Sequence, residues 1–88
     1  MEIEVFNTKG FRKGDFVRVI MNDDSEETIQ LERGKVYMGS PERRHYTTGD
    51  IIPAKPPCIV VQGTLEIPKG RGIPIADVLD VVLVNMPN

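Results

Sequence analysis

Apolar and polar side chains alternate at every second position along much of the chain, which is the pattern of half-buried β-strands. In residues 1–5 three apolar side chains alternate with two glutamates, so a first strand is expected there. A second strand is expected over Phe16–Met21, directly after the turn Lys13-Gly14-Asp15. Both faces of this second strand are largely apolar, which places it inside a sheet rather than at an edge.

A hairpin is predicted around Arg33-Gly34, because Gly tolerates the positive φ of a two-residue turn. Its strands would be Glu27–Glu32 and Lys35–Gly39. This register places apolar residues opposite one another on one face: Leu31 with Val36, and Ile29 with Met38. A slip of one residue would send every one of these side chains to the other face. The pattern therefore predicts antiparallel pairing of the two segments.

Residues 40–57 break the alternation. Pro53, Pro56 and Pro57 exclude a helix and a central strand from the second half of this segment. A connection of this length is long for a compact domain, and such loops usually carry function or are mobile. We expect a long loop, with Arg44–Thr48 as a short edge strand inside it.

The last third of the chain predicts two more strands and one helical turn. Cys58–Ile67 reads as a long strand with a bend at Gly63, and Val81–Val84 as the final strand, which Met86 would extend. Pro74 fits the first position of a helical turn. We therefore expect a single all-β domain over residues 1–88. Its five or six short strands would form a strongly bent sheet closed into a barrel, with one short helical turn near the C-terminus.

The stretch Lys13-Gly14-Asp15-Phe16-Val17-Arg18-Val19 resembles the GDxVxV opening strand of SH3-like barrels. These are small modules that bind RNA, DNA or protein, so the resemblance implies a binding module. It extends to Gly39, beyond which the proline-bearing loop departs from the pattern. It implies no particular ligand, and no binding residues are carried over.

Composition describes an ordinary small globular domain. The chain has 88 residues, of which 40% are hydrophobic and 27% charged, and its net charge is -2. Hence no overall basic field attracts nucleic acid or an acidic membrane. No apolar run reaches the ~20 residues of a membrane span. A lone cysteine, Cys58, fits a reducing compartment, and the opening residues lack the pattern of a secretory signal. A cytoplasmic location without membrane association is expected.

Catalytic and metal-binding arrangements find little support. Cys58, His45 and Asp50 are the residue types of a nucleophilic triad, but no spacing brings them together. One cysteine and one histidine do not form a zinc motif. The acidic segment 22–27 lacks the spacing and central glycine of a calcium loop, and predicts a solvated turn with local hydrogen bonds. No enzymatic activity, metal or cofactor is expected.

Basic side chains are concentrated in the predicted turns and in the long loop. The partner-binding candidates in the loop are Arg43, Arg44, His45 and Tyr46. The candidates for phosphate or nucleic-acid contacts are Lys9, Arg12, Lys13, Arg33, Lys69 and Arg71. If three basic turns gather at one end, they form a positive pole, beside which Tyr46 and Phe11 would offer stacking surfaces. The alternative is that charges simply alternate around a soluble barrel.

The acidic total favours a protein partner over nucleic acid. A second copy of the chain is an equally acceptable partner, because small domains gain buried surface by association. A nucleic-acid-binding barrel is the alternative. An enzyme or a small-ligand carrier ranks last, since so short a chain has little volume for a buried pocket.

Overall fold

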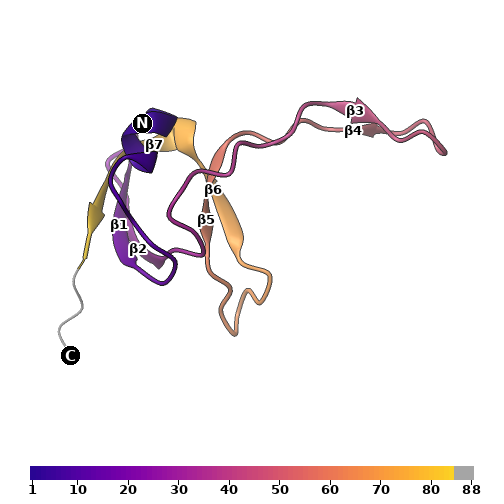
Figure 1. The fold of residues 1–88 in the computed structure, drawn as a ribbon. Helices are drawn as coiled ribbons and strands as arrows, with labels where there is room; N and C mark the ends of the chain where they lie inside the picture. Colours follow the sequence, from indigo (N-terminus) through magenta and orange to yellow (C-terminus); the bar gives the residue numbers. More distant parts are fainter. Residues whose placement is uncertain (85–88) are drawn as a thin grey trace.

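A computed structural model describes residues 1–84 of the chain (Figure 1). The elements are α1 (Ile3–Asn7), β1 (Phe16–Met21), β2 (Glu26–Gln30), β3 (Arg43–Arg44), β4 (Ile51–Ile52), β5 (Cys58–Val61), β6 (Arg71–Pro74), the 3₁₀ helix η1 (Ile75–Asp77) and β7 (Val78–Leu83). The prediction of an all-β fold class is confirmed. Met86, which was expected to extend the final strand, lies outside the described residues. Among those residues, no helix has the length and apolar character to cross a membrane.

The central sheet has the order β2-β1-β7, with all pairs antiparallel. β1 is its middle strand, as predicted from the apolar character of both its faces. Val17 and Val19 are fully buried on one face of β1, where they lie opposite Ile29 of β2 and Val81 of β7. Alternation along β1 thus supplies the centre of the hydrophobic core.

The hairpin predicted around Arg33-Gly34 is wrong. β2 pairs with β1 instead, through a tight turn over residues 22–25. Asp24 takes a positive φ of 69° in that turn, and the Asp23 carboxylate accepts the backbone N–H of Ser25 at 3.0 Å. Asp tolerates this backbone region and bonds its own turn, so the polar segment closes a short hairpin. One hydrogen-bonding edge of β2 is therefore occupied by β1 and is not free for residues 35–39.

A bend at Leu31 joins the central sheet to the pair β5-β6. Leu31 bridges to Val61, and two backbone bonds flank this bridge: Glu32 N to Val60 O at 3.0 Å and Gln62 N to Gln30 O at 2.9 Å. Pairing therefore runs in the order β7-β1-β2-β5-β6. Within residues 1–84 β6 does not pair with β7, so the predicted closed barrel is wrong and the sheets stay open. β6 ends at Pro74, which has no N–H for further pairing, and η1 then carries the chain to β7.

The first residues form the short helix α1 rather than the predicted strand. A helical turn places Ile3 and Phe6 on one side, and Phe6 is fully buried in the core. The N-terminal amine donates to the backbone oxygens of Ile75 and Val78. These contacts outweigh the strand preference of an apolar–polar alternation that is only a few residues long.

The predicted strand Cys58–Ile67 ends early, at Val61. Beyond it the chain forms a tight loop, in which a Cβ added at Gly63 would lie 2.3 Å from the backbone oxygen of Pro68. Leu65 is 101% exposed in this loop, so its apolar side chain does not continue a strand face. The helical turn expected at Pro74 is found as η1, over Ile75–Asp77. The final strand expected over Val81–Val84 is found as β7, which begins three residues earlier and ends at Leu83.

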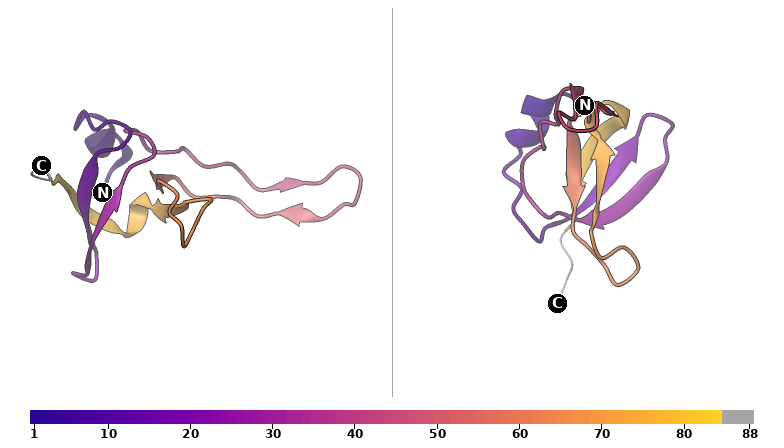
Figure 2. Two further views of the ribbon diagram at one scale, coloured as in Figure 1. Left: turned by 90° about the horizontal axis from the view of Figure 1, so that it is seen from below. Right: turned by 90° about the vertical axis from the view of Figure 1, so that its right-hand side faces the viewer.

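Residues 37–58 form a two-stranded arm that projects from the body of the domain (Figures 1 and 2). The longest dimension of the molecule, 51 Å against 29 and 24 Å, reflects this projection. One register runs along the arm, from the bridge Tyr37–Cys58 through Ser40–Lys55 to β3 and β4. The segment 40–57 is therefore a paired hairpin rather than a loop. The short edge strand expected over Arg44–Thr48 is instead β3, which covers Arg43–Arg44.

Candidate functional site

Backbone hydrogen bonds hold the root of the arm. Tyr37 and Cys58 exchange both bonds at 2.9 Å, and Ser40 and Lys55 exchange bonds of 3.1 and 2.8 Å. Gly39 lies between these pairs with a φ of +77°, and a Cβ added there would meet the Lys55 oxygen at 2.2 Å. Only glycine fits this position, so the path by which the arm leaves the body is fixed by the sequence.

The tip of the arm is closed by its own side chains and backbone. His45 N donates to Asp50 O at 2.8 Å, and Gly49 N donates back to His45 O at 2.8 Å. The rings of His45 and Tyr46 stack with centroids 5.7 Å apart, and Thr47 Oγ1 lies 2.8 Å from His45 Nδ1. Tyr46 is nevertheless 94% exposed. The tip therefore presents an aromatic ring to solvent on an ordered turn.

The strands of the tip place each arginine beside an isoleucine. Arg43 lies opposite Ile52, and Arg44 lies opposite Ile51, which is 59% exposed. Neither arginine forms an ion pair within residues 1–84. The structure thus brings Arg43, Arg44, His45 and Tyr46 together, and it adds two isoleucines to them. We use "tip" below for residues 43–52.

The same register separates the residue types of a nucleophilic triad. Cys58 lies at the root of the arm, whereas His45 and Asp50 pair at its tip. Eight residues of extended strand separate Tyr37 from His45, which is roughly 25 Å at about 3.3 Å per residue. Within residues 1–84 no group of three or more His, Cys, Asp or Glu side chains could hold a metal ion.

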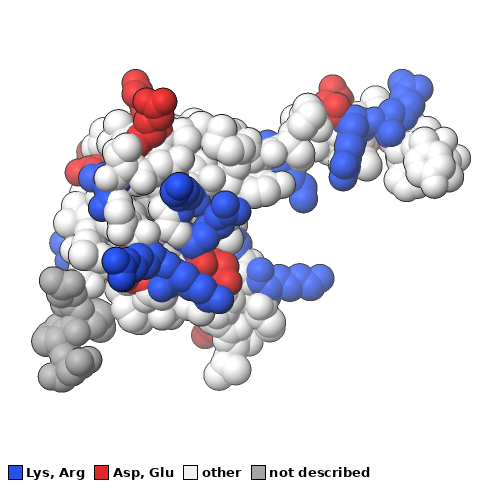
Figure 3. Space-filling model, viewed as in Figure 1, with Lys and Arg blue, Asp and Glu red and all other residues white. Residues whose placement is uncertain are grey.

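Two of the predicted basic turns pack against each other on the body. A Cβ added at Gly34 would lie 1.9 Å from the backbone oxygen of Phe11, so the turns that carry Arg12 and Arg33 are in contact. Figure 3 shows Lys and Arg side chains grouped over this part of the body. Lys13 is partly neutralised by Glu32 at 3.3 Å. We use "basic surface" for Arg12, Lys13, Arg33 and Lys35.

The other basic candidates are already engaged or lie apart. Lys9 pairs with Asp80 at 3.7 Å, and Arg71 forms an ion pair with Glu27. Lys69 lies in the loop before β6, on a different turn. The Phe11 ring packs against Phe6 with centroids 5.3 Å apart, so it is not the free stacking surface that the sequence suggested.

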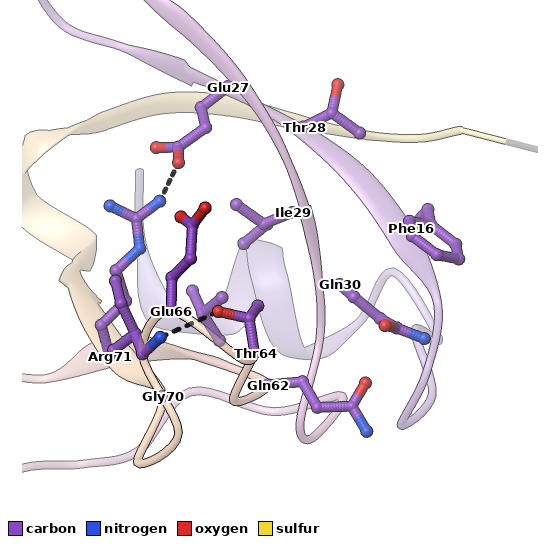
Figure 4. A pocket seen from close by; sticks show the side chains of 12 residues that line it. Phe16, Glu27, Thr28, Ile29, Gln30, Gln62, Thr64, Glu66, Gly70 and Arg71 are labelled. Atoms are coloured by element: carbon purple, nitrogen blue, oxygen red, sulfur yellow. Dashed lines mark hydrogen bonds and ion pairs between the residues drawn. The ribbon is translucent and has the colours of Figure 1, made fainter.

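The sequence did not predict a groove of about 470 Å³ between β2 and the loop over residues 62–70 (Figure 4). Its apolar lining consists of Phe16, Ile29, Val61 and Ile67, of which Ile29 and Val61 are buried core residues. Its other lining residues are Glu27, Thr28, Gln30, Gln62, Thr64, Glu66, Gly70 and Arg71. The groove exists because β2 bends at Leu31 towards β5, and the predicted hairpin register contained no such contact.

Carboxylates dominate the charged lining of the groove. Glu27 is paired with Arg71, whereas Glu66 has no ion pair within residues 1–84. In Figure 4 the Glu66 side chain points towards the Arg71–Glu27 pair. Gln62 also contributes a buried side-chain oxygen that accepts no hydrogen bond from the described residues. The groove therefore combines apolar surface with surplus negative charge.

No protein-family model, curated protein or solved structure matches this chain.

Proposed function

We propose that the protein is a non-catalytic binding module that engages a protein partner, or a second copy of itself, through the arm. The observation that carries this proposal is the arm itself. No side chain from residues 37–58 belongs to the buried core of the described chain, so the arm adds nothing to the hydrophobic core of the body.

A two-stranded ribbon of this kind is marginally stable in water when nothing packs on it. Its strand edges leave backbone groups free to pair, and such edges are normally shortened, charged or covered. The tip carries Arg, Tyr and Ile, and Arg and Tyr are among the residue types that contribute most to binding at protein interfaces. An arm with these properties is best explained by a partner that covers it.

We also propose that the body is an opened relative of the SH3-like scaffold, since β6 and β7 do not pair within residues 1–84. Support comes from the opening strand, which carries the GDxVxV motif at residues 14–19, and from a sheet that bends at Leu31 between β2 and β5. In this interpretation the arm is an insertion between two strands of an otherwise compact module. The scaffold positions the arm and leaves the choice of partner to its side chains.

Affinity capture tests the proposal. The tagged protein is incubated with a nuclease-treated extract of its source cells at high salt, in parallel with the Arg43→Ala/Arg44→Ala variant. Lys69→Ala serves as a control, because it removes a cation from a loop outside the arm. The proposal expects a partner that the wild type and K69A retain and that the double variant loses. Unchanged capture by the double variant would contradict it.

Nucleic acid is the second candidate partner, and the contact between the two basic turns favours it. In that case the basic surface would follow phosphates, and affinity would fall steeply with salt as counterions are released. Arg33→Ala should then weaken binding to a single-stranded oligonucleotide about equally for all sequences. Binding that is tight and independent of salt would exclude this candidate.

A further inference from the structure

We propose that the tip of one copy docks into the groove of a second copy. This inference rests on the proposed function of the arm and names its partner. The tip supplies two arginines that form no ion pair within residues 1–84, beside the exposed Ile51, and the groove supplies apolar side chains beside Glu66, which also has no ion pair there. The two surfaces are therefore complementary in apolar character and in charge.

The groove is built to receive apolar side chains. Its lining includes the exposed large hydrophobic residues Phe16 and Ile67 and the core residues Ile29 and Val61. Leaving such surface in water is unfavourable by about 25 cal/mol per Å². An isoleucine or tyrosine from an arm tip would cover this surface, and the volume suits a few side chains rather than a whole strand.

The negative charge of the groove favours the tip, which carries two arginines, as the segment that binds in it. The charged lining of the groove carries Glu27 and Glu66 against Arg71, which leaves one surplus negative charge. Glu26 continues the acidic surface along β2, towards Asp23 and Asp24 in the adjoining turn. Arg43 is free to form forked hydrogen bonds with a carboxylate such as Glu66.

The positions of the arm and the groove in the fold require that the contact forms between two copies of the chain. β5 begins at Cys58, where the arm leaves the body, and ends at Val61, where the groove begins. The arm and the groove therefore lie at opposite ends of the same strand, and Figure 1 shows the arm directed away from the loop over residues 62–70. A tip cannot reach the groove of its own chain without breaking the backbone bonds at the arm's root.

The contact joins two different surfaces, so it is a heterologous interface. Each copy would offer one tip and one groove, which produces a ring when the rotation closes and a filament when it does not. Assembly should weaken as salt rises, because charges at the rim of the interface are screened.

Sedimentation analysis with reversed charges tests the proposal. Wild-type protein should assemble at concentrations below about 1 mM, and Glu66→Arg should weaken assembly at least about tenfold through like-charge contact. Arg43→Glu/Arg44→Glu should do the same. Both changes lie on exposed surface, and circular dichroism checks that each variant is folded. Lys69→Glu reverses a charge on the same loop outside the groove lining, and it should assemble like the wild type.

Mixing the two defective variants gives the decisive result. The altered tip of the Arg43→Glu/Arg44→Glu variant then meets the altered groove of E66R, with the charges of the pair exchanged. The native tip of E66R meets the native groove of the other variant. The proposal expects assembly to return on mixing. It is overturned by a wild type that stays monomeric, by normal assembly of E66R, or by a mixture that stays dissociated. A monomer that still captures a partner through Arg43 and Arg44 would reject self-docking alone, whereas capture that ignores both arginines would reject the proposed function.

Discussion

At Gly34 two segments of the body are in close backbone contact. A Cβ there would lie 1.9 Å from the backbone oxygen of Phe11 and 2.6 Å from its carbonyl carbon. Because both contacts are with backbone, no side-chain rotation can relieve them. The two basic turns therefore depend on the absence of a side chain at this residue.

Replacing Gly34 with alanine should lower the free energy of unfolding by about 2–3 kcal/mol, since overpacking forces the backbone to shift. Urea denaturation measures this change. Gly10→Ala is the matched control, because Gly10 has a φ of +78° and nothing within 4 Å of an added Cβ. It should cost about 1 kcal/mol from backbone strain alone. Equal losses in the two variants would show that the Phe11 contact is unimportant.

Asp23 illustrates how a local turn affects titration. The hydrogen bond from the Ser25 hydroxyl, followed by the bond from the Ser25 backbone, lowers the pKa of Asp23 below its usual 3.8. A lowered pKa means that the folded turn favours the ionised carboxylate. The contribution of Asp23 to stability is therefore complete above the unfolded pKa and is lost as the pH falls through the folded one.

Ser25→Ala removes the larger of these causes and should raise the pKa of Asp23 towards 3.8. Titration of the carboxyl carbon by NMR measures the shift. Ser40→Ala changes a hydroxyl at the root of the arm and should leave the Asp23 titration unaltered. A titration curve of Asp23 that is the same in S25A and wild type would contradict the assignment.

At the scale of elements, Leu31 connects the two sheets of the body. Its side chain is fully buried, and its bridge to Val61 lies where β2 turns towards β5. Leu31→Ala should lower the free energy of unfolding by about 3 kcal/mol, as expected for a buried leucine. Leu65→Ala changes the same side chain at an exposed site and should cost less than about 0.5 kcal/mol. Similar losses in thermal or urea denaturation would argue against a core centred on this bend.

The arm should be separable from the body. Replacing residues 41–54 with an Asn-Gly turn joins Ser40 to Lys55, which already form a hydrogen-bonded pair. The free energy of unfolding of this arm-shortened variant should stay within about 1 kcal/mol of the wild type, because no core residue is removed and the loop becomes shorter. Loss of cooperative unfolding would show that the arm has a structural role.

Sequence patterns predicted the elements whose environment is set locally. β1 follows its apolar alternation, β7 lies in the apolar run near the C-terminus, and Pro74 directly precedes η1. The Arg33-Gly34 hairpin failed because two registers satisfy the same alternation, and the polar turn at residues 22–25 decides between them. Pairing across the arm was equally invisible, since it depends on contacts between Tyr37 and Cys58 that local patterns do not encode.

The candidate site also has a part that could be predicted from the sequence and a part that could not. Arg43, Arg44, His45 and Tyr46 could be selected from their residue types, and the hairpin then places them together. The groove could not be predicted, because its lining combines Ile29 of β2 with Val61 of β5. That contact follows from the bend at Leu31, which the incorrect register had hidden. Long-range pairing was therefore the missing information.

At the scale of the whole molecule, one acidic turn and one basic loop lie on different sides of the body. The right-hand view of Figure 2 shows the β1–β2 turn pointing away from the side on which the loop between α1 and β1 runs. The first carries Asp23 and Asp24, and the second carries Arg12 and Lys13. A body with these two charged segments and a projecting arm is suited to association in a fixed orientation.

Comparing the arm-shortened variant with the wild type in affinity capture tests the central claim most directly. Each protein is tagged, co-expressed with an untagged copy of the same sequence and purified from nuclease-treated extract at low salt, because charges at the interface are screened at high salt. We predict that the wild type retains a protein partner, the untagged copy included, and that the folded variant without its arm retains none. Recovery of the same partners by both proteins would contradict the account, because binding would then reside in the body.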